Sequence, residues 1–134
     1  LQRDETTVRL GPAKGKDFAT SFGPWLVTPD ELADRRSGKA YDLACTTEVN
    51  GTILSRGNLN TIHHSFGAMI ERASADARLV AGDVIGSGTV GGGCLLEIKD
   101  ESGFGRYLQP TDRVTIRVEH LGELSTPVVN RRDG

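Results

Sequence analysis

Hydrophobic and β-branched residues stand on both sides of the polar dipeptide Asn50-Gly51, in the stretch YDLACTTEVNGTILSRG over residues 41–57. Such residues are typical of β-strands, and Asn-Gly is a favoured sequence for a two-residue type I′ turn. The pattern therefore predicts a β-hairpin whose two strands meet at Asn50-Gly51.

Two segments have the spacing or the caps of a helix. After the possible caps Asn60 and Thr61, apolar residues recur at helical spacing, at Ile62, Phe66, Met69, Ile70 and Ala73. This spacing predicts an amphipathic helix of about three turns whose apolar stripe contacts the core. Upstream, Thr28-Pro29-Asp30-Glu31 has the residue types of a capping box and predicts a short helix from Pro29 to Arg36. We expect the apolar segment FGPWLV before it, residues 22–27, to be buried.

Short strand-like runs dominate the chain beyond this helix. They are LVAGDVIGSG (79–88), CLLEIKD (94–100), YLQPTDRVTIRVEHLG (107–122) and ELSTPVV (123–129). The stretches from Leu79 to Ile85 and from Leu108 to Val114 share a leucine, a turn position, an aspartate and a strand start, which indicates one turn conformation used twice. No linker-like tract divides the sequence. We therefore predict a single domain, residues 1–134, of the α+β class and mainly β.

Composition narrows the class of function. Hydrophobic residues make up 37% of the chain and charged residues 25%, as in a soluble globular protein. A net charge of -2 without a basic stripe argues against a nucleic-acid partner. No apolar run approaches the roughly 20 residues that span a bilayer, so no membrane partner is expected either. Cys45 and Cys94 lack metal-ligand spacing; they could pair, but free, buried thiols in a reducing cytoplasm are the favoured interpretation.

The glycine-rich stretch GSGTVG, Gly86 to Gly91, matches the dinucleotide fingerprint G-x-G-x-x-G. That fingerprint works because a helix follows the glycines and directs its N-terminus at the pyrophosphate. Here the strand-like run CLLEI follows, which argues against a dinucleotide site. Two interpretations remain. The glycines bend a sheet, which the residues alone favour, or Gly88 and Thr89 present a hydroxyl and an amide to a carboxylate or enolate oxygen.

Other chemistry-bearing residues are scattered. His63 and His64 would begin the predicted helix, where neighbours point about 100° apart, so we expect surface or core histidines rather than a metal pair. Lys16 precedes the apolar segment and is either a solvated loop lysine or a group that polarises a carbonyl. A third group consists of Glu119, His120 and Glu123. Gly122 argues against a helix through these residues, so we predict a turn at the end of a strand. The residues alone therefore predict no metal site in this chain.

Several short motifs follow one another over essentially the whole chain. They are Leu1-Gln2, Gly11-Pro12, Gly15-Lys16-Asp17-Phe18, Gly23-Pro24-Trp25-Leu26-Val27, Asn50-Gly51, Leu79 with Gly82-Asp83-Val84-Ile85, Gly88-Thr89, and the ending at 107–122. In this order they resemble the C-terminal part of the catalytic domain of the fumarylacetoacetate hydrolase family. The resemblance implies a mixed β-roll with one or two short helices, usually as a homodimer.

The resemblance also implies an activity. Family members bind a divalent cation, commonly Mg²⁺ and otherwise Mn²⁺ or Ca²⁺, which chelates a 2-oxo acid or 1,3-dicarbonyl substrate and stabilises the enolate as a Lewis acid. Some hydrolyse a C–C bond in acylpyruvate- or fumarylacetoacetate-like substrates. We expect such a hydrolase. The second interpretation is a decarboxylase or isomerase of the same family, acting on oxaloacetate or on a 2-hydroxyhepta-2,4-dienedioate; the third is a non-catalytic binding module.

By position, the resemblance makes Lys16 the catalytic lysine beside the metal and the substrate oxygens, with Thr20 as its hydroxyl neighbour near the metal. Gln2 would contact the substrate. Gly88 and Thr89 would bind the substrate's carboxylate or carbonyl.

The chain departs from the family pattern at three points. Ala19 stands where some members have Gly, and Thr111 replaces the usual Gly before Asp112. The third departure is larger: the family's Glu-x-Glu pair, a further metal-binding Asp and a catalytic His would precede Leu1. We therefore expect the missing N-terminal part of the same protein to supply the metal ligands, and this chain alone to be inactive.

Overall fold

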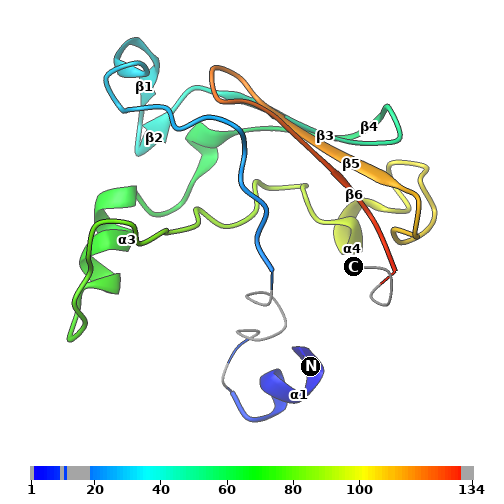
Figure 1. Ribbon diagram of the computed structural model, residues 1–134, viewed down its shortest axis with the longest axis horizontal. Helices are drawn as coiled ribbons and strands as arrows, with labels where there is room; N and C mark the ends of the chain where they lie inside the picture. The colour runs from blue at the N-terminus through cyan, green and yellow to red at the C-terminus, as the bar shows by residue number, and fades with distance from the viewer. Residues whose placement is uncertain (1, 10, 12–18, 131–134) are drawn as a thin grey trace.

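A four-stranded antiparallel sheet is the largest element of the computed structural model, which describes residues 2–9, 11 and 19–130 (Figure 1). The strand order is β4-β3-β5-β6. The strands are β3 Ala44–Val49, β4 Thr52–Asn58, β5 Arg113–Val118 and β6 Gly122–Pro127. A smaller antiparallel sheet consists of β1 Arg36–Ser37 and β2 Ala40–Tyr41. With the short helices described below, these sheets confirm the predicted α+β class, in which sheet is the main element.

The hairpin predicted at Asn50-Gly51 is confirmed. Strands β3 and β4 pair antiparallel, and Val49 lies opposite Thr52. Both turn residues have positive φ, 51° at Asn50 and 82° at Gly51, as a type I′ turn requires. Val49 is also paired with Val114 on β5. The turn therefore lies beside the start of the next strand of the sheet.

The predicted last strand pair is present as well. Strands β5 and β6 pair along their whole length. On this sheet Arg117 connects three strands, because its Nε donates to Glu123 Oε2 at 2.7 Å on β6 and its Nη1 donates to Glu48 on β3. Opposite charges on neighbouring strands favour this register.

The two similar stretches at 79–85 and 108–114 adopt the same turn, as predicted. The strand predicted at 79–88 is wrong, because these residues pair with no strand, and a strand follows the second turn alone, β5 from Arg113. In each, the aspartate side chain accepts a hydrogen bond from the N–H three residues earlier, from Val80 to Asp83 Oδ2 at 2.9 Å and from Gln109 to Asp112 Oδ2 at 2.8 Å. The aspartate N–H donates back to the carbonyl of that earlier residue, at 3.1 Å and 3.0 Å. The side chain and the backbone of each aspartate thus close the turn together.

The residue before the aspartate is Gly82 in the first turn and Thr111 in the second, and both have positive φ, 104° and 83°. This conformation strains a β-branched residue but not glycine. We expect Thr111→Gly to raise the free energy of unfolding by about 0.5–1 kcal/mol, net of the greater freedom of glycine in the unfolded chain. The reverse change, Gly82→Thr, should lower it. Urea unfolding measures both, and a Thr111→Gly variant less stable than the parent would contradict the strain.

The helix predicted at residues 62–73 begins later than expected. Helix α3 spans Phe66–Ala73, and the Ser65 side chain caps it. The residues expected as caps form part of a 3-10 helix instead, η2 Leu59–Thr61. Several cap-forming residues compete in this stretch, and the last of them begins the helix. His63-His64 therefore lies in the loop between η2 and α3.

The helix predicted from Pro29 to Arg36 is wrong. Residues 29–32 form turns, and a 3-10 helix follows, η1 Ala33–Arg35. The chain cannot continue as a helix because Arg36 pairs with Tyr41 in the small sheet. The Thr28 hydroxyl bonds to the Asp30 carboxylate, which lowers the pKa of that carboxyl.

The strand predicted at residues 94–100 is also wrong, because this run forms the one-turn helix α4 Leu95–Ile98. Short apolar runs fit either a buried strand or a helix, so their pattern does not decide between them. A helix thus does follow the glycine-rich stretch. The argument against a dinucleotide site rests instead on topology: the fingerprint needs a parallel βαβ unit, whereas both sheets of the described residues are antiparallel and residues 79–93 pair with no strand.

The buried core is small. In the described part of the chain, four apolar residues are buried, Leu32, Leu43, Cys45 and Val49. Cys45 and Cys94 are both free thiols, the former buried and the latter half-buried, and burial raises the pKa of the Cys45 thiol. Across the described residues we find no helix long and apolar enough to cross a membrane.

The apolar segment at residues 22–27 is not buried, contrary to expectation. Phe22, Trp25 and Leu26 are 63%, 70% and 96% exposed. The segment runs past the end of the sheet, where the Trp25 ring lies against Gly122 (Figure 1). The accessible surface of the whole chain is 10310 Å², about 1.5 times that of a compact monomer of this mass. Burial needs a partner surface, and the described segments do not provide one here.

Candidate functional site

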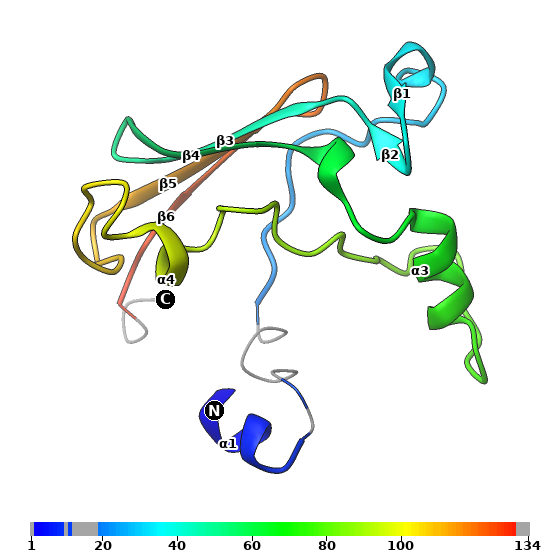
Figure 2. The same cartoon turned by 180° about the vertical axis from the view of Figure 1, so that it is seen from behind.

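A cavity of about 320 Å³ lies where the loop before α3 meets the glycine-rich stretch. Residues from 59–64 and 87–91 line it, together with Met69 of α3. Figure 2 shows the course of this segment: the chain leaves α3 and passes below the sheet to α4, and the glycine-rich stretch lies on this path, just before α4. Two of the predicted substrate-binding residues, Gly88 and Thr89, line this cavity.

Two further glycines hold the Gly88-Thr89 loop in place. A Cβ atom on Gly57 of β4 would lie 2.4 Å from Val90 Cγ1, so a side chain there would push Val90 off the strand. A Cβ atom on Gly93 would lie 2.8 Å from the Val90 carbonyl oxygen and 3.0 Å from Thr89 Cγ2. The Gly93 N–H donates to this same carbonyl at 2.8 Å and closes a tight turn. The loop is therefore anchored on the sheet at Val90.

We expect Gly57→Ala to displace Val90 and lower the free energy of unfolding by roughly 1–3 kcal/mol through overpacking. The backbone amide resonances of Gly88 and Thr89 should shift with it. A suitable control is Gly86→Ala, because a Cβ atom there would meet nothing within 4 Å and φ is not positive. Amide spectra that change equally in both variants would contradict an anchor at Gly57.

His63 and His64 line the same cavity as the glycine-rich stretch. Their rings touch edge-on, with centroids 4.6 Å apart. The Lys39 ammonium donates to the His63 carbonyl oxygen at 2.7 Å and holds this loop against the small sheet. Both histidines are exposed, as expected of surface residues. Their position beside Gly88-Thr89 could not be predicted, because no local pattern links the two segments.

No other predicted site residue is among the described residues that line this cavity. Thr20 is exposed and is not part of its lining. Gln2 begins helix α1 Gln2–Thr7, which lies apart from the sheet in Figure 1. Lys16 falls outside the described residues. The roles assigned to Lys16, Thr20 and Gln2 remain predictions.

The described residues do not fit a divalent cation. No group of three or more His, Cys, Asp or Glu side chains among them is placed to hold a metal ion. Of the candidate group, Glu119 and His120 lie in the turn between β5 and β6, as predicted, with φ of 62° at His120, whereas Glu123 lies on β6. Within the group, His120 Nε2 lies 3.6 Å from Glu119 Oε1, a contact between exposed side chains, while Glu123 pairs with Arg117.

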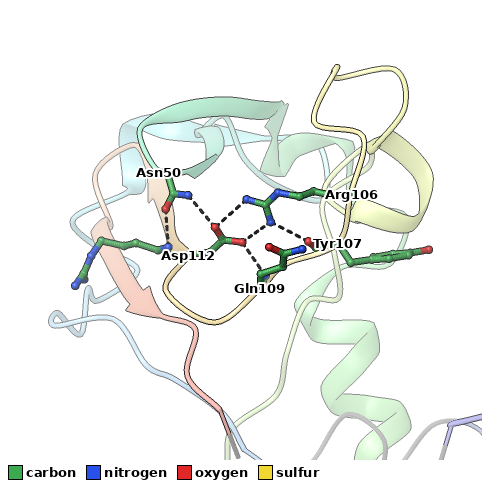
Figure 3. A network of polar contacts seen from close by, with 6 residues as sticks. Asn50, Arg106, Tyr107, Gln109 and Asp112 are labelled. Atoms are coloured by element: carbon green, nitrogen blue, oxygen red, sulfur yellow. Dashed lines mark hydrogen bonds and ion pairs between the residues drawn. The ribbon is translucent and has the colours of Figure 1, made fainter.

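A second polar cluster surrounds Asp112. This residue is only 4% exposed and is far more buried than the histidines that line the cavity. Figure 3 shows its carboxylate held by two bonds from Arg106, at 2.6 and 2.9 Å, and by the Asn50 amide at 2.8 Å. Asn50 Oδ1 accepts in turn from the Arg113 N–H at 2.8 Å. The Arg106 bonds, with the N–H of Gln109, hold the pKa of Asp112 well below its usual range. Both carboxylate oxygens of Asp112 accept hydrogen bonds from within the protein, so we interpret this cluster as a structural contact that holds two turns together.

Comparisons with known proteins agree with this fold. The chain matches the family described as Fumarylacetoacetate (FAA) hydrolase C-terminal over residues 1–129. It is 35% identical over 109 residues to the 2,4-didehydro-3-deoxy-L-rhamnonate hydrolase of a Sphingomonas species, covering 81% of this chain and 35% of that protein.

Two solved structures are similar. The fumarylacetoacetate hydrolase of Exiguobacterium antarcticum has a TM-score of 0.64 and 29% identity, over 82% of this chain and 36% of that one. The 2-hydroxyhepta-2,4-diene-1,7-dioate isomerase of Mycobacterium marinum has a TM-score of 0.60 and 25% identity, over 96% of this chain and 43% of that one. The chain thus spans between 35% and 43% of the length of these three relatives. It belongs to the fumarylacetoacetate hydrolase family, and it corresponds to the family's C-terminal region.

Proposed function

We propose that this chain is the substrate-binding, C-terminal part of a hydrolase that cleaves a C–C bond in a 2-oxo acid or 1,3-dicarbonyl substrate, of the acylpyruvate or fumarylacetoacetate type. The observation that carries the proposal is the cavity at Gly88-Thr89. Gly88 has no side chain and a φ of 81°, so the backbone can approach a ligand closely. Thr89 can then offer a hydroxyl and an amide to an oxo-acid oxygen.

In this reaction water adds to the acyl carbon, the C–C bond breaks, and its electron pair becomes an enolate that later takes a proton. Donors fixed beside the oxo-acid oxygen stabilise the charge of that enolate. In the proposed site, Thr89 holds that oxygen, and Lys16, Thr20 and Gln2 complete the substrate contacts. The divalent cation, Mg²⁺ or Mn²⁺ or Ca²⁺, would take its ligands from sequence outside this chain, in a cytoplasmic homodimer.

The second candidate is an isomerase or decarboxylase of the same family. The similarity to an isomerase from Mycobacterium marinum, over 96% of this chain, supports an isomerase as the second candidate. Each of these reactions passes through an enolate, so the contacts proposed for Thr89 would serve all of them. The products distinguish them.

The experiment uses a polypeptide of the relatives' length that contains this chain, supplied with Mg²⁺ and acetylpyruvate. We expect pyruvate and acetate as products, and a kcat/KM roughly 100-fold lower in Thr89→Val, since one oxyanion donor is lost. Full activity in Thr89→Val would overturn the role of Thr89, and an isomerised product would favour the second candidate.

For the 134-residue chain by itself, calorimetry should detect no tight Mg²⁺ site. A tight single site would overturn the proposal that the metal ligands lie outside this chain.

A further inference from the structure

The cavity at Gly88-Thr89 has a second polar end. Of the described residues that line it, His63 and His64 are those whose side chains can carry charge. The described lining also includes apolar side chains, from Leu59, Ile62 and Met69, and the hydroxyl residues Thr61 and Ser87. A volume of about 320 Å³ is at the small end of ligand cavities. The cavity therefore suits a short carbon chain that carries two polar groups.

The imidazole rings of His63 and His64 can donate hydrogen bonds to a ligand. Among the residues described, neither ring forms a hydrogen bond or an ion pair, and their one ring contact is with each other. Arg72 and His64 line an adjoining cavity, and the Lys39 ammonium bonds to the His63 carbonyl. No carboxylate in the described part of the chain lines either cavity. The charged groups around the histidines are thus cations, which favour an anion over a metal ion.

We infer that His63 and His64 bind an anionic group of the ligand whose oxo-acid end lies at Gly88-Thr89, so that the site selects a substrate with two carboxylates. The inference rests on the proposed function for the Gly88-Thr89 end. Each imidazole donates an N–H to the far carboxylate, and protonation adds a charge that strengthens the bond. An adjacent histidine pair with no third ligand does not complete a zinc site, which needs three or four protein ligands.

The test measures affinities of this chain by NMR titration with three probes: pyruvate, 2-oxoglutarate and glutarate. We expect 2-oxoglutarate to bind about tenfold more tightly than pyruvate at pH 6, because charge-assisted hydrogen bonds to a second carboxylate are added. In the double variant His63→Asn, His64→Asn the ratio should fall to about one, while the pyruvate affinity is retained. His120→Asn, which changes the one other histidine of the chain, should leave the ratio unchanged.

The outcomes separate this inference from the proposed function. An unchanged ratio in the double histidine variant, with pyruvate binding that still depends on Thr89, overturns the inference alone. Glutarate that shifts the histidine resonances while pyruvate leaves Gly88 and Thr89 unperturbed supports the anion site and overturns the oxo-acid site. Absence of binding by all three probes overturns both.

Discussion

Replacing Asp112 by alanine should lower the midpoint of thermal unfolding by about 10 °C, because it removes the centre of a buried hydrogen-bond network. Arg106 loses both of its carboxylate bonds, and the amide of Asn50 loses its acceptor. Since Asn50 is the first residue of the β3–β4 turn and also accepts from the Arg113 N–H, the damage reaches both hairpins of the sheet.

The same contacts make stability depend on pH. The Arg106 bonds lower the folded-state pKa of Asp112, whereas an aspartate in the unfolded chain titrates near pH 4, that is about 3.9. Below that pH the unfolded chain binds a proton that the folded chain does not, so acid favours unfolding. The stabilisation is complete above the unfolded-state pKa and is lost as pH falls toward the folded-state value. The difference in stability between the parent and Asp112→Asn should therefore shrink from pH 6 to pH 3.

Asp83→Ala is the matched control, because Asp83 closes the same turn without an arginine partner. Its carboxylate accepts one bond, from the Val80 N–H, and is exposed. We expect a decrease in the midpoint of only about 2–3 °C, as for an exposed turn residue. Equal decreases for Asp83→Ala and Asp112→Ala would mean that Arg106 and Asn50 contribute nothing beyond the turn itself.

The parts of this fold that could be predicted from sequence are those that a few neighbouring residues determine. Asn50-Gly51 suits positive φ at both positions, so the hairpin follows from two residues. The paired turns at Asp83 and Asp112 follow in the same way from an aspartate that bonds to its own backbone three residues back.

The parts that could not be predicted depend on partners distant in sequence. Burial of residues 22–27 was expected from their apolar character, but burial requires a covering surface, and Leu26 is 96% exposed. The run at 94–100 is apolar enough for a strand, yet without a strand to pair with it forms a turn of helix. Asn60, Thr61 and Ser65 are all possible N-caps of α3, and the spacing of apolar residues alone does not identify Ser65 as the one used.

The candidate site divides in the same way. Gly88-Thr89 could be identified in the sequence because a motif marks it, and the structure places it on a cavity. His63-His64 carries no motif, and it lines that cavity because the fold brings the loop before α3 to the glycine-rich stretch. Sequence reasoning finds residues that act through local conformation, whereas the second end of a binding site needs the fold.

Gly122→Ala should lower the free energy of unfolding by about 2–4 kcal/mol, since it combines backbone strain with a steric clash. Gly122 begins β6 with a φ of 93°, which an L-residue rarely adopts. A Cβ atom there would lie 2.7 Å from Trp25 Cδ1 and 3.0 Å from Trp25 Nε1. Trp25 is the one tryptophan of the chain, so its fluorescence reports on this contact directly. We expect the emission of Trp25, whose side chain is already 70% exposed, to change as the indole is displaced from Gly122.

Gly38→Ala separates the two causes. Gly38 also has positive φ, 56°, but a Cβ atom there would meet nothing within 4 Å. This control should lose about 1 kcal/mol from strain alone and keep the parent emission maximum. In the double variant Trp25→Ala, Gly122→Ala, the clash is gone, so the cost of the glycine substitution should fall to that of Gly38→Ala. If the cost of Gly122→Ala is the same with and without Trp25, the indole does not pack against the turn, and the exposed segment at residues 22–27 has no anchor on the sheet.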